Sequence, residues 1–191
     1  MKSIAVFCGS SAGFNEVYTR TSRHLGELLA DQGITLVYGA GDVGLMGIIA
    51  NAVLSKKGKV IGSIPQFLVD KEVAHKGISE IIVTRTMHER KQKMVDIADG
   101  VIVLPGGIGT LDEFFEMFTW QQLGLHEKPI GILNINGFYD HLLAHIAHMV
   151  KEGFLKDFHA ARVIVQKDPK LLIEKMKQQK IEYIDKWWVK K

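Results

Sequence analysis

A strand, a glycine-rich turn and the start of a helix follow one another between residues 101 and 116. Residues 101–104 (VIVL) form a short run of branched apolar side chains, typical of a strand covered on both faces and too short for a helix. Pro105 ends this run, and glycines follow at positions 106, 107 and 109. Because glycine permits backbone angles and close approaches that a Cβ forbids, the amides of this turn can line a concave surface beside a helix N-terminus. The stretch therefore predicts a buried strand of an α/β sheet that ends at an anion site, most commonly one for phosphate.

Similar apolar runs recur along the chain and alternate with segments of helical periodicity. The expected strands are residues 4–7, 34–38, 60–64, 81–84, 101–104, 129–134 and 163–165. This alternation, with glycine turns after successive strands, predicts a Rossmann-like, doubly wound and mostly parallel sheet with helices on both faces. We assign residues 1–180 to this single domain and residues 181–191 to a C-terminal tail.

The composition is that of a soluble globular chain. Its 191 residues are 47% hydrophobic, and 24 basic residues against 21 acidic ones leave a formal charge of +3, too small a bias to indicate nucleic-acid binding. The sequence shows no signal peptide and no apolar run of membrane-spanning length, and the lone Cys8 excludes an internal disulfide. A cytoplasmic protein is therefore expected. We interpret the aromatic and basic end of the tail, at Trp187 and Trp188, as packing on its own domain or on a second subunit.

Polar, glycine-rich loops follow the first two expected strands. Ser10 and Ser11 lie at the carboxyl end of the first strand, where open α/β sheets place their ligands, although a simple turn would have the same composition. The second loop, residues 39–47, matches the G-x-G-x-x-G pattern and includes Gly44. A dinucleotide site also requires an acidic residue about twenty positions further on, and residues 59–64 contain none. The pattern favours a loop that faces a nucleotide over an NAD site.

An arginine falls on the inward face of the helix expected at residues 87–98. Met87, Arg90, Met94 and Ile97 have the spacing of a single helix face. A buried guanidinium needs a carboxylate or phosphate partner, and its fork geometry suits both. The alternative is an arginine whose stem packs while its charged head reaches water.

Glu113 has two interpretations. Thr110 and Glu113 fit the S/T-x-x-E capping box, in which each side chain satisfies the other residue's backbone amide. Alternatively, Glu113 is a carboxylate beside the anion site that acts on a sugar or on a water molecule. The apolar stripe of this helix runs through Leu111, Phe114 and Phe118 and leaves Glu113 on the other side.

These loops and helix starts would meet at one edge of the sheet. A pocket there would combine the amides of the glycine turn, the inward Arg90 and the carboxylate of Glu113, which suggests chemistry on a nucleotide or sugar phosphate. The irregular stretch at residues 65–79 holds Glu72, which fits either a functional loop or a solvated surface. His141 and His145 form an HxxxH pair, but no glutamate follows the first histidine and both lie away from the core stripe, so no metal site is expected.

Three separated motifs resemble those of the LONELY GUY family, the cytokinin riboside 5′-monophosphate phosphoribohydrolases. Residues 105–113 (PGGIGTLDE) fit the family's PGGxGTxxE signature, and residues 87–91 (MHERK) are similar to its MHxRK segment. Residues 38–47 (YGAGDVGLMG) are similar to its YGGG…GLMG loop. The motifs occur in the family's order, and the resemblance covers residues 4–176. Four residues depart from the usual pattern. Ala40 stands where the family has glycine and Ile108 where tyrosine is common, and Asp112 and Thr86 replace a glutamate and an aspartate.

The resemblance implies hydrolysis of the N-glycosidic bond of a nucleoside 5′-monophosphate, such as AMP or an N6-modified AMP, to free base and ribose 5-phosphate. It implies that Arg90 and Glu113 are the catalytic pair and that no metal or other cofactor is needed. Family members are homodimers or larger, often with the site near the subunit interface. The substrate-binding residues that we expect, from the resemblance and from the same loops and helix starts, are Glu72, Lys91, Gly106, Gly107, Ile108, Gly109, Thr110, Leu111, Asp112, Thr119, Ser10, Gly44 and Met87.

Two other functions remain open for a chain with these motifs. A related branch with the same sheet carries the molybdenum cofactor without turning it over, and a phosphate-binding turn would also serve such a nucleotide-binding or carrier protein. The presence of both Arg90 and Glu113 favours the hydrolase. The lysine decarboxylase label often attached to such sequences would require pyridoxal phosphate on a lysine Schiff base, for which Lys91 is the nearest candidate.

Overall fold

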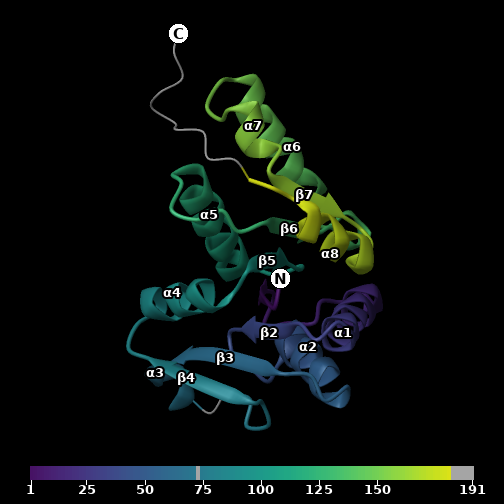
Figure 1. The fold of residues 1–191 in the computed structure, drawn as a ribbon, viewed down its shortest axis with the longest axis vertical. Coiled ribbons are helices and arrows are strands. Elements are labelled where there is room, and N and C mark those ends of the chain that lie inside the picture. Colours follow the sequence, from purple (N-terminus) through teal and green to yellow (C-terminus); the bar gives the residue numbers. More distant parts are fainter. Residues whose placement is uncertain (72–73, 182–191) are drawn as a thin grey trace.

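Seven strands form one parallel sheet in the order β4-β3-β2-β1-β5-β6-β7 (Figure 1). The computed structural model describes residues 1–71 and 74–181. The strands are β1 Ser3–Phe7, β2 Thr35–Tyr38, β3 Val60–Pro65, β4 Glu80–Thr84, β5 Gly100–Val103, β6 Ile130–Leu133 and β7 Val163–Gln166. All neighbouring strands pair in parallel, which confirms the predicted fold class.

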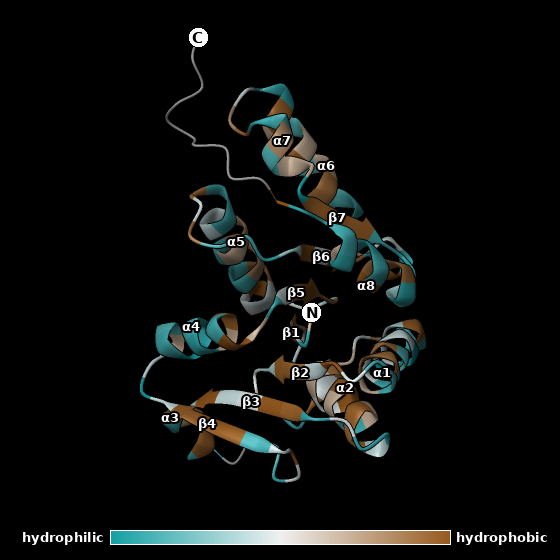
Figure 2. Cartoon of the chain, viewed as in Figure 1, coloured by the Kyte–Doolittle hydropathy of each residue, from teal (hydrophilic) through white to brown (hydrophobic). Residues whose placement is uncertain are grey.

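Helices cover both faces of the sheet, as a doubly wound fold requires. On one face lie α1 (Glu16–Asp31), α2 (Gly44–Ser55) and α8 (Pro169–Gln178), and on the other α4 (Met87–Ile97), α5 (Ile108–Gln122) and α6 (Asp140–Lys151) (Figure 1). Shorter elements are α3 (Gln66–Val69), the 3₁₀ helix η1 (Ile135–Gly137) and α7 (Asp157–Ala160). Alternate strand residues supply the two cores, so Ile4 and Val6 of β1 face the first set of helices while Ala5 and Phe7 face the second. Figure 2 shows apolar residues along most of the strands.

Two local predictions are wrong. The stretch at residues 65–79 is not wholly irregular, because α3 lies at its start. The buried residues of α4 are Lys91, Met94 and Val95, whereas Met87 is exposed. The true buried face is therefore displaced by one residue from the predicted one, and Arg90 lies at its margin.

The last described helix, α8, begins with a proline and is capped by an aspartate. α8 begins with Pro169, and the N-cap Asp168 accepts a hydrogen bond from Leu171 N at 2.8 Å. The expected tail, residues 181–191, lies outside the described residues except for Ile181. Within the described ranges, no helix combines the length and the apolar character that crossing a membrane requires.

Three loops meet where the strand order reverses, between β1 and β5. The carboxyl ends of the strands at such a reversal are where open α/β sheets bind ligands. Gly9 N donates to Pro105 O at 3.0 Å, and Leu45 N donates to Gly9 O at 3.1 Å, so hydrogen bonds join the loops after β1, β2 and β5. Gly44 has a φ of 59°, and a Cβ there would overlap the backbone of Ser10. The close approach of the first two loops therefore depends on glycine at position 44.

Candidate functional site

A cleft of about 480 Å³ lies over the carboxyl ends of β1, β2 and β3 and beside the start of α5. Its floor and walls come from segments that are far apart in the sequence. The lining residues are Cys8, Gly9, Ser10, Gly39, Gly41, Val43, Met46, Ile64, Leu68, Arg90, Gly107, Ile108, Gly109, Thr110 and Glu113. Among the described residues of this lining, Arg90 and Glu113 are the only ionisable side chains apart from Cys8, and they set its electrostatics.

Arg90 reaches the cleft from α4 and does not extend to solvent. Its Nε donates to the backbone oxygen of Ser63 at 3.1 Å, and its Nη2 lies 3.6 Å from Oε1 of Glu113. The side chain is only 11% exposed. A Cβ at Gly39 would overlap the guanidinium, so glycine at this position leaves the space that Arg90 occupies. The interpretation of Arg90 as a partly buried arginine paired with a carboxylate is the one that the geometry supports.

The capping-box interpretation of Glu113 is wrong. α5 begins at Ile108, its N-cap is Gly107, and no side chain caps it, so Thr110 lies inside the first turn. Glu113 consequently lies in the second turn, with 10% of its side chain exposed, on the buried side of the helix and not opposite the core. The earlier start of the helix turns the carboxylate toward Arg90.

Burial dominates the acidity of Glu113. Desolvation raises the pKa of its carboxyl group from the usual 4.5 to about 7, with Arg90 and then Lys91 working in the opposite direction. A carboxyl group with a pKa near neutrality can exchange a proton at the pH of a cell. Burial, followed by the charge of Glu113, also raises the pKa of the Cys8 thiol, so this thiol stays protonated and is a poor nucleophile.

Lys91 lies behind the cleft wall and joins α4 to α5. Its buried ammonium is 3.1 Å from Oδ2 of Asp112 and 2.8 Å from Oε2 of Glu116. Burial alone would lower the pKa of Lys91, but the bonds to Glu116 and Asp112 outweigh it and the pKa is raised. The two ion pairs hold Arg90 and Glu113, the neighbours of Lys91 and Asp112 in the chain, on facing helices.

The start of α5 presents unpaired amides to the cleft. The first hydrogen bond of this helix runs from Leu111 N to Gly107 O at 3.2 Å, so the amides of residues 108–110 have no acceptor within the helix. A Cβ at Gly106 would overlap Oγ1 of Thr110, which explains glycine there. Ile108 is 83% exposed at the cleft mouth. Free amides and the positive end of a helix dipole make this turn suitable for an anion.

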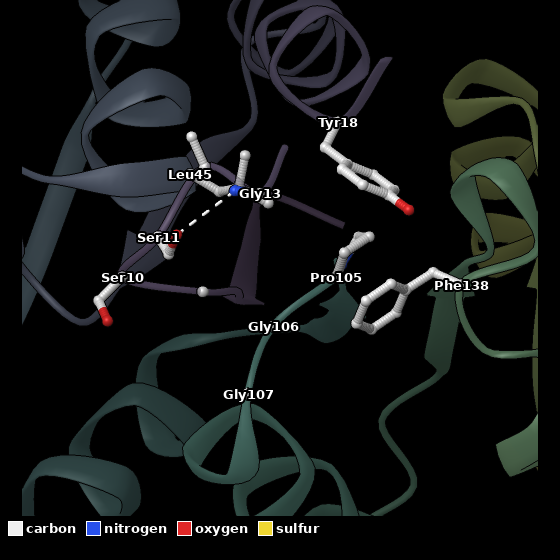
Figure 3. A pocket seen from close by; sticks show the side chains of 11 residues that line it. Ser10, Ser11, Gly13, Tyr18, Leu45, Pro105, Gly106, Gly107 and Phe138 are labelled. Atoms are coloured by element: carbon white, nitrogen blue, oxygen red, sulfur yellow. Dashed lines mark hydrogen bonds between the residues drawn. The ribbon is translucent and has the colours of Figure 1, made fainter. Parts of the chain in front are cut away.

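A smaller hollow of about 250 Å³ adjoins the cleft and shares Gly9, Ser10 and Gly107 with it. Figure 3 shows the rings of Tyr18 and Phe138 on one side of this hollow and the serines of the β1 loop on the other. The ring centroids are 5.9 Å apart in an edge-to-face arrangement. The part of the chain that the structure describes places no charged side chain in the lining of this hollow, which distinguishes it from the cleft.

The structure brings about half of the expected site residues to the cleft. Those that line it are Arg90, Glu113, Ser10, Gly107, Ile108, Gly109 and Thr110. Those that do not are Gly106, which lines the smaller hollow, and Gly44, Met87, Lys91, Leu111, Asp112 and Thr119. Glu72 lies outside the described residues. Sequence reasoning missed Cys8, Val43, Met46, Ile64 and Leu68, although Cys8 and Ile64 could have been suspected from their places at strand ends.

Comparison with known proteins finds relatives that cover most of the chain. Residues 46–176 match the family model described as "Possible lysine decarboxylase". The cytokinin riboside 5′-monophosphate phosphoribohydrolase of Rhodococcoides fascians is 46% identical over 87% of this chain and 85% of its own length. The enzyme LOG5 of Arabidopsis thaliana, with the same descriptive name, is 41% identical over 94% of this chain and 78% of its own.

Solved structures with the same fold are more distant in sequence. The molybdenum cofactor binding protein of Rippkaea orientalis superposes with a TM-score of 0.71 at 24% identity, covering 92% of this chain and 95% of that one. The molybdenum cofactor carrier protein of Chlamydomonas reinhardtii gives 0.71 at 20% identity, covering 92% and 96%. These likenesses concern the fold alone, whereas the phosphoribohydrolases share 41–46% of their residues with this chain over most of its length. The chain belongs to the LONELY GUY family of cytokinin riboside 5′-monophosphate phosphoribohydrolases.

Proposed function

We propose that this protein hydrolyses the N-glycosidic bond of a nucleoside 5′-monophosphate, AMP or an N6-modified AMP, to free base and ribose 5-phosphate. The observation that carries the proposal is the pairing of Arg90 with Glu113 at 3.6 Å inside a cleft that also contains the amides of a helix start. A phosphate, a ribose and a base each need a different kind of surface. The cleft offers amides for the phosphate, a carboxylate for the ribose and apolar walls for the base.

The 5′-phosphate would bind at the glycine turn. The amides of residues 108–110 have no acceptor within the helix, Ser10 also lines the cleft, and the dipole of the 15-residue helix α5 favours negative charge at its start. Arg90 would add a full positive charge to this end of the cleft, which offsets the repulsion between the phosphate and Glu113.

Glu113 would act at the anomeric carbon. As the bond from C1′ to the base nitrogen breaks, its electron pair leaves with the base and positive charge develops on the ribose, which a nearby carboxylate stabilises. A water oxygen then bonds to C1′, and its proton passes to Glu113 or to the departing base. The ionised form of Glu113 is required for either role, and Arg90 favours that form.

The apolar residues of the cleft would contact the base. Val43, Met46, Ile64 and Leu68 form this part of the lining, and Ile108 extends it at the mouth. Flat apolar surface accepts the faces of a purine and the carbon atoms of an N6 substituent without a specific hydrogen bond. Adenine nucleotides with and without such a substituent are therefore the substrates to compare.

The residues do not fit a pyridoxal phosphate enzyme. Such a decarboxylase needs a neutral lysine in the site to form the Schiff base. No lysine is among the described residues that line the cleft, and the ammonium of Lys91 is held charged by two carboxylates. The family description as a possible lysine decarboxylase therefore does not agree with the chemistry of this cleft.

We also propose a cytoplasmic homodimer. β4 is an edge strand, and Ile81 and Val83 on one of its faces are exposed, as are Phe67 of α3 and Met87 of α4. A second copy of the chain would bury this apolar surface next to the cleft, which contains Leu68 of α3. Val83→Glu should yield a monomer by light scattering after size exclusion, whereas Leu171→Glu, a change at an exposed leucine of α8, should not.

Base release tests the proposed reaction directly. Purified protein should release adenine from AMP or from an N6-modified AMP, measured by chromatography, and Glu113→Ala should abolish release while the nucleotide still binds. Glu174→Ala, at an exposed glutamate of α8, is the matched control. If no nucleoside monophosphate yields free base while molybdenum cofactor binds tightly, the protein is a carrier and the proposal is wrong.

A further inference from the structure

Ala40 adopts a backbone conformation that favours glycine. It lies in the turn between β2 and α2, is fully buried, and has a φ of 60°. A side chain with a Cβ is strained in this left-handed region, and such strain persists only where the surroundings hold it. The slot around it is tight, because a Cβ added at Gly62 of β3 would come within 2.5 Å of the Ala40 Cβ.

This strained turn shapes the cleft. Gly39 leaves the space for the Arg90 guanidinium, and Gly41 and Val43 line the cleft itself. A change in the path of the backbone at Ala40 would therefore move the wall against which Arg90 packs. Because Arg90 is paired with Glu113, such a change would also alter the geometry of the pair.

His75 holds the turn from the opposite side. Its backbone N donates to Ala40 O at 2.8 Å, and the adjacent Ala74 forms an antiparallel bridge with Gly41. The buried imidazole accepts from Gly77 N through Nδ1 at 3.0 Å, which places its proton on Nε2. Nε2 lies 3.3 Å from Oδ1 of Asp42 and 3.2 Å from Oδ1 of Asn51.

These contacts join three parts of the chain. Asp42 belongs to the strained turn, Asn51 to α2, and His75 to the segment that leads into β4. We name the contacts of His75 with Ala40, Asp42 and Asn51 the His75 clamp. None of its side chains lines the cleft, so the clamp acts on the cleft only through the turn.

We propose that His75 is a positioning residue, which keeps the strained turn at Ala40 in the conformation that seats Arg90 against Glu113. The effect on activity rests on the proposed hydrolase function. The effect on the turn does not, because it follows from the backbone strain at Ala40 and from the contacts that oppose it. The two parts can therefore fail separately.

Removing the side-chain contacts of the His75 clamp, while the backbone hydrogen bond to Ala40 O remains, should lower turnover more than binding. We expect His75→Ala to reduce kcat for base release roughly 10- to 100-fold, the cost of a small misplacement of catalytic groups, with a smaller change in KM. His75→Gln, whose amide nitrogen can occupy the place of Nε2, should retain most of the activity. His145→Ala, at an exposed histidine of α6, is the control for loss of an imidazole.

Relief of the strain should compensate for loss of the clamp. Glycine at position 40 adopts a φ of 60° without strain, so the turn no longer needs to be held. The loss of kcat caused by His75→Ala should therefore shrink to a few-fold when it is made in the Ala40→Gly background. Because Ala40→Gly should also stabilise the protein, kcat is calculated per folded molecule, with the folded fraction of each variant taken from circular dichroism, so that poor folding of His75→Ala is not counted as a loss of turnover.

Hydrogen exchange measures the turn without any substrate. A peptide covering residues 38–46 should exchange faster in His75→Ala than in the unchanged protein, and Ala40→Gly should reduce the difference. Unchanged exchange in this peptide, or equal loss of kcat in the two backgrounds, would overturn the proposal. If the unchanged protein releases no base but the exchange result holds, the proposed hydrolase function is wrong and the clamp remains.

Discussion

Nη2 of Arg90 lies 3.6 Å from Oε1 of Glu113, with both side chains about nine-tenths buried. The distance is longer than a hydrogen bond, so the pair acts through charge and leaves room for each group to bind a substrate atom. Burial raises the pKa of the carboxyl group, and the guanidinium opposes that increase. Several consequences can be measured.

Loss of the guanidinium should shift the pH dependence of base release. Because the charge of Arg90 lowers the pKa of Glu113, Arg90→Gln should move the acidic limb of the kcat/KM profile to higher pH than its position near pH 7 in the unchanged protein. Arg85→Gln, at an exposed arginine just before α4, should leave the limb in place. An identical limb in Arg90→Gln and the unchanged protein would mean that Glu113 is not the titrating group.

The free energy of unfolding should fall with pH because of Glu113. The pKa of this group is raised from 4.5 to about 7 by burial, so between these values the folded protein binds more protons than the unfolded chain. The contribution of Glu113 to stability is thus present below pH 4.5 and is lost as the pH rises through about 7. Urea unfolding at pH 5 and pH 8 gives the free energy of unfolding at each pH. Its decrease from pH 5 to pH 8 should be smaller in Glu113→Gln, which cannot ionise, than in the unchanged protein.

Lys91 should be important for stability. Lys91→Met removes the ammonium from Asp112 and Glu116 and leaves two neighbouring carboxylates without their cation, which should lower the free energy of unfolding by about 1–3 kcal/mol. Urea titration gives this value. Lys93→Met, at an exposed lysine of the same helix, should change it by less than about 0.5 kcal/mol. Equal values for the two variants would show that the ion pairs do not hold α4 to α5.

A glycine at position 40 should stabilise the protein. Ala40→Gly relieves a positive φ but adds freedom to the unfolded chain, and the net gain expected is about 0.5–1 kcal/mol. The same change at Ala144, an exposed alanine within α6, should instead cost about 0.5–1 kcal/mol. Thermal unfolding should show a higher melting temperature for Ala40→Gly and a lower one for the change at Ala144. A loss of stability in Ala40→Gly would exclude strain at this turn.

Local sequence patterns were sufficient to predict the sheet and the glycine-rich loops that lie beside the cleft. Apolar runs of three to six residues predicted all seven strands, because the strands of a covered parallel sheet consist mostly of branched apolar residues. The glycines after β1, β2 and β5 marked the loops that the structure joins, since only glycine allows the close approach of Gly44 to Ser10. Motifs in a fixed order were enough to indicate the family.

Tertiary structure decided the state of the ionisable groups. The S/T-x-x-E pattern is local and suggested a cap at Thr110, but α5 starts two residues earlier and buries Glu113 against Arg90. Likewise, Lys91 resembles a substrate-binding residue in sequence, yet its ammonium is occupied by Asp112 and Glu116. The paired groups lie more than twenty positions apart in the sequence. The periodicity of a single helix or strand carries no information about such distant contacts.

The sequence by itself determined the order of strands and helices and the glycine turns, because these follow from backbone freedom and from the spacing of apolar residues. Only the folded chain decided that β1, β2, β3 and α5 would share one cleft, that Cys8 and Ile64 would line it, and that His75 would hold the turn at Ala40. The physical reason is that each of these contacts joins segments separated by other elements. Their energies arise only after the sheet has assembled.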